Sequence, residues 1–276
     1  MKNFITRALT GIVFVAILVS AIYFHSYYFL GVFSLITGLT LWELYGLVLP
    51  EASPFNRFMG AIGGAYLFAA TFGYTEKGMG AWIFLPYLLI LIYLMVVALY
   101  EKGKNPLTHW SMLLFGQAYC AGSFSLLNGL AYKSELIEGL APMPIFILAL
   151  FVLIWLNDTG AYLIGSMLGK HRLFARISPK KSWEGFFGGL AVAVLGSQLL
   201  AALDPLYSHL QWMGLAIVVV AFGTWGDLIE SLLKRTIGVK DSGNLLPGHG
   251  GMLDRFDSLL LAAPASYIYI ELFIRN

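Results

Sequence analysis

The chain has 276 residues, of which 59% are apolar and only 12% are charged, with a formal net charge of +2. Soluble domains carry about 25% charged residues, so the composition argues against a soluble protein. The single cysteine, Cys120, excludes an intrachain disulfide bond. The net charge itself says little about partners, and we expect no nucleic-acid ligand.

Apolar segments near the length needed to cross a bilayer, about 20 residues, recur along the whole chain. The first follows Lys2 and Arg7 and could be mistaken for a cleaved leader. Because the rest of the chain is equally apolar, we expect a retained first span. Turn and helix-breaking residues separate the segments. The predicted spans are 8–24, 27–49, 58–74, 81–100, 108–131, 142–167, 183–203, 211–233 and 256–274.

These spans predict an all-α, polytopic transmembrane bundle that forms one integral membrane domain, residues 1–276. Within this domain, we interpret residues 1–140 as N-terminal helices without a specific function, and residues 141–276 as the catalytic helices and cytoplasmic loops. Fourteen of the 17 lysines and arginines fall on the side of the N-terminus. The positive-inside rule places that side in the cytoplasm. We therefore expect a multi-pass protein of a bacterial-type cytoplasmic (inner) membrane, with a cytoplasmic N-terminus, an external C-terminus and a cytoplasmic active site.

Carboxylates inside apolar spans are costly, and they usually face a bundle interior or a wet cavity. Glu43 lies near the cytoplasmic end of its predicted span. We expect its carboxylate to make a structural hydrogen bond to a neighbouring helix. The others gather in the C-terminal half, which a structural role explains less well. They are Asp158, Glu184, Asp227, Glu230 and Asp257.

The run from Asp227 to Lys234 forms one polar stripe on a predicted helix. Asp227, Glu230, Ser231 and Lys234 are spaced i, i+3, i+4 and i+7, so they share a face. Such a face could bind a metal ion and a phosphate. The structural alternative is a buried ion pair between Glu230 and Lys234. We favour function, because charge inside a membrane is seldom retained without use.

A glycine-rich loop precedes the last predicted span. Gly248, Gly250 and Gly251 would let the backbone approach an anion closely. Asp254 and Asp257 follow, one turn apart where a helix would begin, so Asp257 could simply cap that helix. Asp254 and Asp227 make a better pair for a hard cation. His249 could bind phosphate or act as an acid, or be structural.

Residues 157–185 form a third polar region. Ala161, Gly165 and Gly169 recur every fourth residue, which is typical of close helix packing, and Asp158 with Tyr162 forms a neighbouring stripe. Ser178 followed by Pro179 predicts a helix start. Lys180 and Lys181 lie beside this helix start and could bind a phosphate group. Alternatively, the two lysines follow the positive-inside rule or contact lipid head groups.

Two common chemistries are missing from the sequence. There is no G-x-x-x-x-G-K-[ST] motif, which argues against a P-loop enzyme. There is also no Cys/His cluster of the kind that binds zinc.

One run of 27 residues closely resembles the signature of the phosphatidate cytidylyltransferases, or CDP-diacylglycerol synthases. It comprises Ser231-Leu-Leu-Lys234-Arg235, Lys240-Asp241-Ser-Gly243, Pro247-Gly-His249-Gly250-Gly251 and Asp254-Arg255-Phe-Asp257. Residues 157–185 resemble a second region of that family. The N-terminal half is similar only in length, hydropathy and its opening Arg7-Ala-Leu-Thr10.

The resemblance implies that CTP and phosphatidate are converted to CDP-diacylglycerol and pyrophosphate, with Mg²⁺ as cofactor and a second metal or K⁺ also compatible. It implies Asp227 and Asp254 as metal ligands. We expect membrane lipids as partners, and a homodimer is compatible with the sequence, which does not itself determine the oligomeric state. The catalytic candidates are Asp227, Asp254, Lys234, Arg235 and His249. The substrate-binding candidates are Lys181, Ser178, Lys240, Asp241, Gly250, Gly251, Arg255, Asp158, Glu184 and Asp257.

Two alternatives stay open at this point. A CTP-dependent lipid kinase would move the terminal phosphoryl group of the nucleotide instead. An ion-coupled transporter would use buried carboxylates to carry ions. Against transport, no pair of broken helices repeats along the chain, and the polar residues gather toward one membrane face.

Overall fold

The computed structural model describes residues 2–100, 105–132, 144–204, 206–245, 248 and 250–275, with side chains from Leu9 onward. The chain forms two compact units. Unit 1 comprises Met1–Pro144 and Asp241–Phe256, and unit 2 comprises Ile145–Lys240 and Asp257–Asn276. The late segment Asp241–Phe256 thus belongs with the N-terminal helices.

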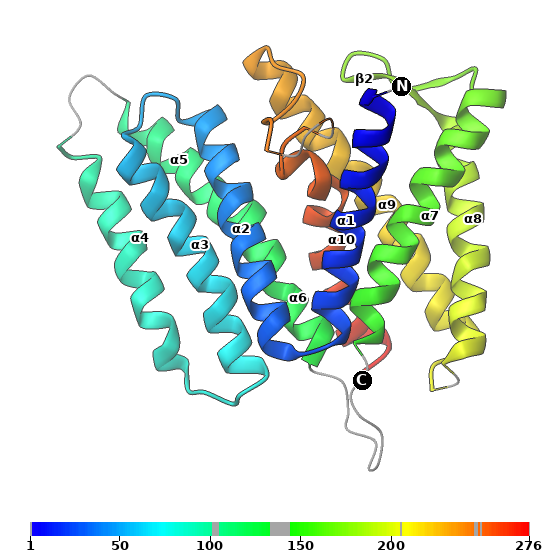
Figure 1. Ribbon diagram of the computed structural model, residues 1–276, viewed down its shortest axis with the longest axis horizontal. Coiled ribbons are helices and arrows are strands. Elements are labelled where there is room, and N and C mark those ends of the chain that lie inside the picture. Colours follow the sequence, from blue (N-terminus) through cyan, green and yellow to red (C-terminus); the bar gives the residue numbers. More distant parts are fainter. Residues whose placement is uncertain are drawn as a thin grey trace. The chain divides into compact units, whose positions relative to one another are not determined.

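Unit 1 is built from helices, with α3 between α2 and α4 (Figure 1). Ser53 and Asn105 cap the helices that follow them, each with proline at the first helical position. A π-helical turn joins the last two helices of the unit into one rod. The elements are α1 (Lys2–Tyr23), α2 (Ser26–Val48), α3 (Pro54–Thr75), η1 (Ala81–Phe84), α4 (Leu85–Val97), α5 (Pro106–Gly116), η2 (Gln117–Gly122) and α6 (Ser123–Tyr132).

Unit 2 places α8 against both α7 and α9. A short antiparallel hairpin, β1 with β2, connects α7 to α8 and pairs Arg172 with Ser182 and Phe174 with Ser178. Gly238 ends α9 in the left-handed conformation (φ 83°) that glycine adopts most easily. The elements are α7 (Ile145–Leu168), β1 (Arg172–Phe174), β2 (Ser178–Ser182), α8 (Trp183–Leu203) and α9 (His209–Ile237). The last helix, α10 (Leu253–Phe273), begins in the segment assigned to unit 1 and continues in unit 2.

The predicted all-α membrane bundle is confirmed, since helices occupy each of the nine predicted spans. Among the described residues, five helices are long and apolar enough to cross a membrane: α2, α7, α8, α9 and α10. The stretches Leu9–Tyr23 and Ala81–Val97 are apolar but shorter. Nine crossings therefore remain a prediction.

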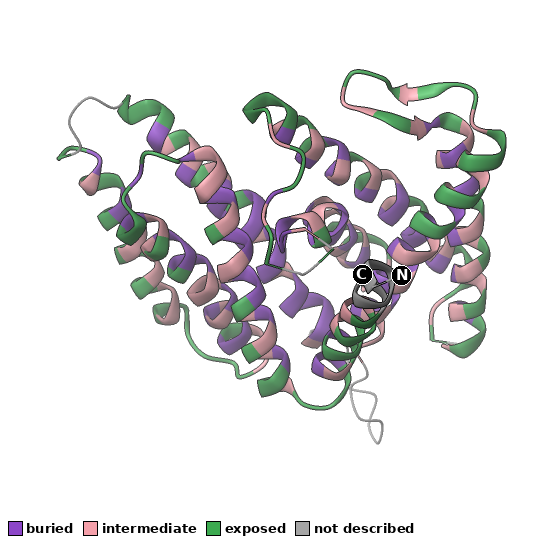
Figure 2. Cartoon of the chain, turned by 45° about the horizontal axis from the view of Figure 1, so that its top comes forward, coloured by how far each residue is buried: buried purple, intermediate pink, exposed green. Residues whose placement is uncertain are grey.

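Exposed and buried residues alternate along these helices (Figure 2), and many of the exposed ones are large and apolar. On α8, Leu195, Leu199 and Leu203 are 71%, 66% and 72% exposed and lie four residues apart. Such continuous apolar stripes are unusual on a soluble protein and suit contact with lipid.

The helix predicted to start at Ser178 is wrong. Ser178 opens strand β2, and α8 begins at Trp183. The helix cap is Ser182, whose Oγ accepts a hydrogen bond from the backbone N–H of Gly185 at 3.1 Å. Pairing with β1 supplies the backbone hydrogen bonds of 178–182, so this tertiary pairing overrides a locally plausible start signal.

The predicted small-residue stripe is confirmed as a close contact between α7 and α8. A Cβ at Gly185 would lie 2.9 Å from the carbonyl oxygen of Ala161 and 3.2 Å from the Cα of Gly165. At Gly189, one would lie 2.7 Å from the carbonyl oxygen of Asn157. Backbone atoms cannot rotate away as side-chain atoms can, so the two helices pack this closely because these positions lack a side chain.

We expect Gly189→Ala to lower the free energy of unfolding by about 1–3 kcal/mol, because the added methyl group must push α7 from α8. Gly31→Ala on α2 is the matched control, since a Cβ there has no neighbour within 4 Å. Thermal unfolding in detergent should show a lower midpoint for the first variant alone. Equal midpoints for the two variants would contradict the close packing.

Candidate active site

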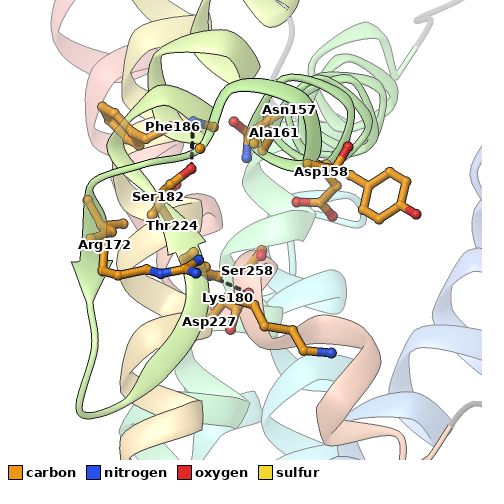
Figure 3. Close-up of a pocket in the computed structure, with 17 residues that line it drawn as sticks. Asn157, Asp158, Ala161, Arg172, Lys180, Ser182, Phe186, Thr224, Asp227 and Ser258 are labelled. Atoms are coloured by element: carbon orange, nitrogen blue, oxygen red, sulfur yellow. Dashed lines mark hydrogen bonds and ion pairs between the residues drawn. The ribbon is translucent and has the colours of Figure 1, made fainter.

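A polar pocket of about 520 Å³ lies in unit 2. Side chains from all four of its helices and from the hairpin converge on it (Figure 3). The lining residues are Asn157, Asp158, Ala161, Tyr162, Gly165, Ser166 and Gly169 from α7 and its end, Arg172, Leu173, Lys180, Lys181 and Ser182 from the hairpin, Gly185 and Phe186 from α8, Thr224 and Asp227 from α9, and Ser258 from α10.

Helix periodicity explains the α7 wall of the pocket. Asp158 and Tyr162 are four residues apart and so stand on one face, as the sequence predicts. Ala161 and Gly165, the small residues of the helix contact, also line the pocket and leave its volume unfilled.

The hairpin supplies the cations. Arg172 on β1 and Lys180 on β2 are exposed, whereas Lys181 is partly buried. The Nζ atom of Lys181 lies 2.5 Å from Oδ2 of Asp227, and each side chain is 29% exposed. This ion pair joins the hairpin to α9 at the pocket wall.

Asp227 is further held from its own helix, since Ser231 donates a hydrogen bond to its Oδ1 at 3.2 Å. Asp257 lies close enough to Asp227, Asp158 and Lys181 to interact electrostatically with each. The carboxylates of Asp158, Asp227 and Asp257 thus lie near three cationic side chains, Arg172, Lys180 and Lys181. Such mixed charge suits an anionic ligand that is bound together with a cation.

Glu184, a predicted substrate-binding residue, contacts the base of the hairpin. It is not among the described residues that line the pocket. Its carboxylate accepts hydrogen bonds from the backbone N–H of His171 at 3.2 Å and lies 2.6 Å from Nδ1 of the same residue. Glu184 therefore fastens the base of the hairpin to the start of α8, and its role in substrate binding stays a prediction.

The structural interpretation of the Glu230–Lys234 pair is confirmed. Lys234 Nζ lies 2.6 Å from Oε2 of Glu230, whose side chain is fully buried, while that of Lys234 is 11% exposed. Neighbouring Arg235 is exposed and donates to the carbonyl oxygen of Val239 at 3.1 Å. The predicted helical face therefore exists, and it is split between Asp227 with Ser231 and an internal ion pair.

Unit 1 holds the glycine-rich part of the predicted site. Asp254 Oδ2 accepts hydrogen bonds from the backbone N–H groups of Ser242 at 2.9 Å and Gly251 at 2.8 Å. Gly250 has a φ of +86°, which a residue with a side chain rarely adopts. These bonds fold the loop back onto the start of α10.

The remaining predicted residues divide as follows. Ser178, Lys234, Arg235 and Lys240 belong to unit 2 but are not among the described pocket-lining residues. Asp241, Gly250, Gly251, Asp254 and Arg255 belong to unit 1. His249 lies outside the described residues.

Three pocket-lining residues were not predicted from the sequence: Arg172, Thr224 and Ser258. Thr224 precedes Asp227 by one helical turn, and Ser258 adjoins Asp257, so both could have been found from helix geometry.

The donor chemistry of the pocket fits magnesium. Mg²⁺ prefers oxygen ligands and is commonly held by one or two carboxylates together with substrate phosphates. Asp227 offers such a carboxylate. Among the described residues, no three or more His, Cys, Asp or Glu side chains are grouped closely enough to hold a metal ion by themselves. A cation shared by Asp227 and Asp254, which lie in different units, stays a prediction.

Curated relatives carry a consistent name. The chain is 48% identical over 121 residues to a phosphatidate cytidylyltransferase of Staphylococcus epidermidis, which covers 43% of this chain and 46% of the relative. It is 50% identical over 125 residues to a phosphatidate cytidylyltransferase of Bacillus subtilis, covering 44% and 46%. The matched stretch thus spans about half the length of these relatives. The match to the cytidylyltransferase family runs over residues 5–273, nearly the whole chain, and the chain therefore belongs to that family.

Proposed function

We propose that the protein transfers CMP from CTP to phosphatidate, giving CDP-diacylglycerol and pyrophosphate for phospholipid synthesis. The observation that carries the proposal is the pocket around the Lys181–Asp227 ion pair, with Arg172 and Lys180 also lining it. Membership of the cytidylyltransferase family and the names of the relatives support the same reaction.

The residues match the demands of this chemistry. An oxygen of the phosphatidate phosphate attacks the α-phosphorus of CTP, a new P–O bond forms, and the bond to pyrophosphate breaks. The attacking group is already an anion, so no strong base is needed. Repulsion between two polyanions is the main obstacle, and positioned cations reduce it. Lys181 and its hairpin neighbours can bind phosphate oxygens, and Asp227 orients the Lys181 ammonium group.

Magnesium would supply further positive charge beside the phosphates when bound. Asp227 would hold it, with Asp254 as the proposed second ligand. We expect Lys234, Arg235, Lys240, His249 and Arg255 to contact phosphates, with support from Asp241 and Asp257. Membrane lipids surround the helices, and phosphatidate keeps its acyl chains in the bilayer. We also expect a homodimer.

The decisive experiment uses purified protein, phosphatidate, Mg²⁺ and CTP labelled at either the α- or the γ-phosphate. We expect the α-label to appear in the lipid and the γ-label in pyrophosphate. A lipid that carries the γ-label would instead establish a CTP-dependent lipid kinase. Ion flux in liposomes without any labelled lipid product would favour the transporter.

The expected topology has its own test. We expect the N-terminus and the active site to face the cytoplasm and the C-terminus to face outward, because 14 of the 17 basic residues fall on one side of the nine predicted spans. A reporter fused after Asn276 should be active only outside the cytoplasm. A reporter that is active in the cytoplasm would contradict the predicted number of crossings.

A further inference from the structure

Glu43, near the end of α2 in unit 1, is hydrogen-bonded to a segment about two hundred residues later in the chain. Its Oε2 accepts a hydrogen bond from the backbone N–H of Leu253 at 2.9 Å and another from Oγ of Ser242 at 3.2 Å. The sequence predicts a hydrogen bond from Glu43 to a neighbouring helix, and that bond is present. Its partners are the first residue of α10 and the loop that precedes it.

Two glycines shape the loop around this carboxylate. A Cβ at Gly243 would lie 2.8 Å from Oε1 of Glu43, and one at Gly251 would overlap Oε2. Gly243 and Gly251 are not among the glycines with positive φ, so their backbones do not themselves require glycine. The close approach of the Glu43 carboxylate leaves no room for a side chain at Gly243, and at Gly251 the Oγ of Ser242 fills the same space together with it.

The hydrogen bonds continue from Glu43 to Asp254. The Oγ of Ser242 also accepts from the backbone N–H of Asp254 at 3.3 Å, while the N–H of Ser242 donates to Oδ2 of Asp254 at 2.9 Å. Gly251 adds a second N–H to the same oxygen at 2.8 Å. Ser242 is thus clamped between the two carboxylates, and a shift of Glu43 would be transmitted to Asp254.

The negative charge of Glu43 suits this place. The first N–H groups of an α-helix have no partner within the helix, and that end carries a partial positive charge. Leu253 and Asp254 supply two such N–H groups at the start of α10, and side chains accept both. Glu43 therefore acts as a helix cap supplied by a distant part of the sequence.

We propose that Glu43 is a positioning residue, which holds the described parts of the segment Asp241–Phe256, residues 241–245 and 250–256, in the conformation that presents Asp254 and the backbone of Gly250 and Gly251 to substrate. The inference rests on the proposed function for the role of Asp254. Whether Glu43 holds this segment in place can be tested without measuring enzyme activity.

Hydrogen exchange of the purified full-length protein measures that hold directly. In Glu43→Ala we expect the amides of 251–254 to exchange at least about tenfold faster, the factor that the loss of one hydrogen bond to a charged group implies. Exchange in α7 and α8 should stay unchanged. Gly243→Ala, whose added methyl group displaces the carboxylate, should have the same effect. Glu43→Gln keeps an acceptor oxygen but loses the charge. Its exchange rates at 251–254 should lie between those of Glu43→Ala and those of the unaltered protein.

Steady-state kinetics separates positioning from general destabilisation. We expect Glu43→Gln to lower kcat while leaving the KM for CTP near its original value, with a similar amount of folded protein. Glu76→Gln is the matched control, because Glu76 pairs with Lys77 at the end of α3, away from the segment. It should leave both exchange and kcat unchanged.

Unchanged exchange at 251–254 in folded Glu43→Ala, or an equal rise throughout α2 and α3, would overturn the proposal. So would an undiminished kcat in that variant. If the unaltered protein makes no CDP-diacylglycerol, the proposed function fails, but the exchange result still decides whether Glu43 holds the segment.

Discussion

Asp227→Asn is expected to lower the turnover of the proposed CDP-diacylglycerol synthesis by about 10²–10³-fold, the usual cost of removing one preorganised electrostatic group from an active site. The carboxylate of Asp227 is held by Lys181 on one oxygen and Ser231 on the other. Asparagine keeps the shape but loses the charge that orients Lys181 and would hold Mg²⁺. The measurement is the initial rate with labelled CTP at saturating substrate concentrations.

Asp204→Asn is the control for this substitution. Asp204 also accepts a local hydrogen bond, since the backbone N–H of Leu206 donates to its Oδ1 at 3.2 Å just after the end of α8. Its replacement should leave turnover unchanged.

Lys234→Met is expected to lower the free energy of unfolding by about 3–5 kcal/mol, because it leaves the buried Glu230 carboxylate without its partner. Adding Glu230→Gln removes the uncompensated charge and should restore most of the stability. Turnover per folded molecule should nevertheless stay low in the double variant, since the proposed phosphate contact of Lys234 is still missing. Unfolding in detergent and activity are measured on the same preparations.

Lys234→Arg provides the complementary test. It keeps the positive charge and the topology signal, but its planar guanidinium group has a different shape and is not interchangeable with an ammonium group at a fitted site. We expect normal insertion and folding with most of the turnover lost. Full activity in either Lys234→Arg or the stable double variant would contradict the proposed phosphate contact. Lys234 would then have only the structural role of its ion pair with Glu230.

Local periodicity was enough to predict much of this structure. Continuous apolar runs predicted the helices, and four-residue spacing predicted both the small-residue packing stripe of α7 and the common face of Asp158 and Tyr162. These features depend only on neighbours within one turn or one helix, so the sequence contains the whole signal.

Features that depend on distant partners were harder to predict. The Ser178–Pro179 pair resembles a helix start, but pairing with β1 makes it a strand. The spacing of Glu230 and Lys234 is compatible with either a binding face or an ion pair, and burial favours the pair. The bond from Glu43 to Leu253 spans 210 positions and has no local pattern at all.

The hairpin between α7 and α8 also offers a place to attach a probe. Its base is secured by Ser182 and by the Glu184–His171 contact, whereas Ala175 and Arg176 at its tip are exposed. Exposed turns of this kind tolerate inserted sequence better than paired strands do. A small fluorophore or epitope placed between Ala175 and Arg176 would therefore sit a few residues from Lys180 and Lys181 without replacing either. The arrival of a nucleotide could then be followed optically in the intact, membrane-embedded protein.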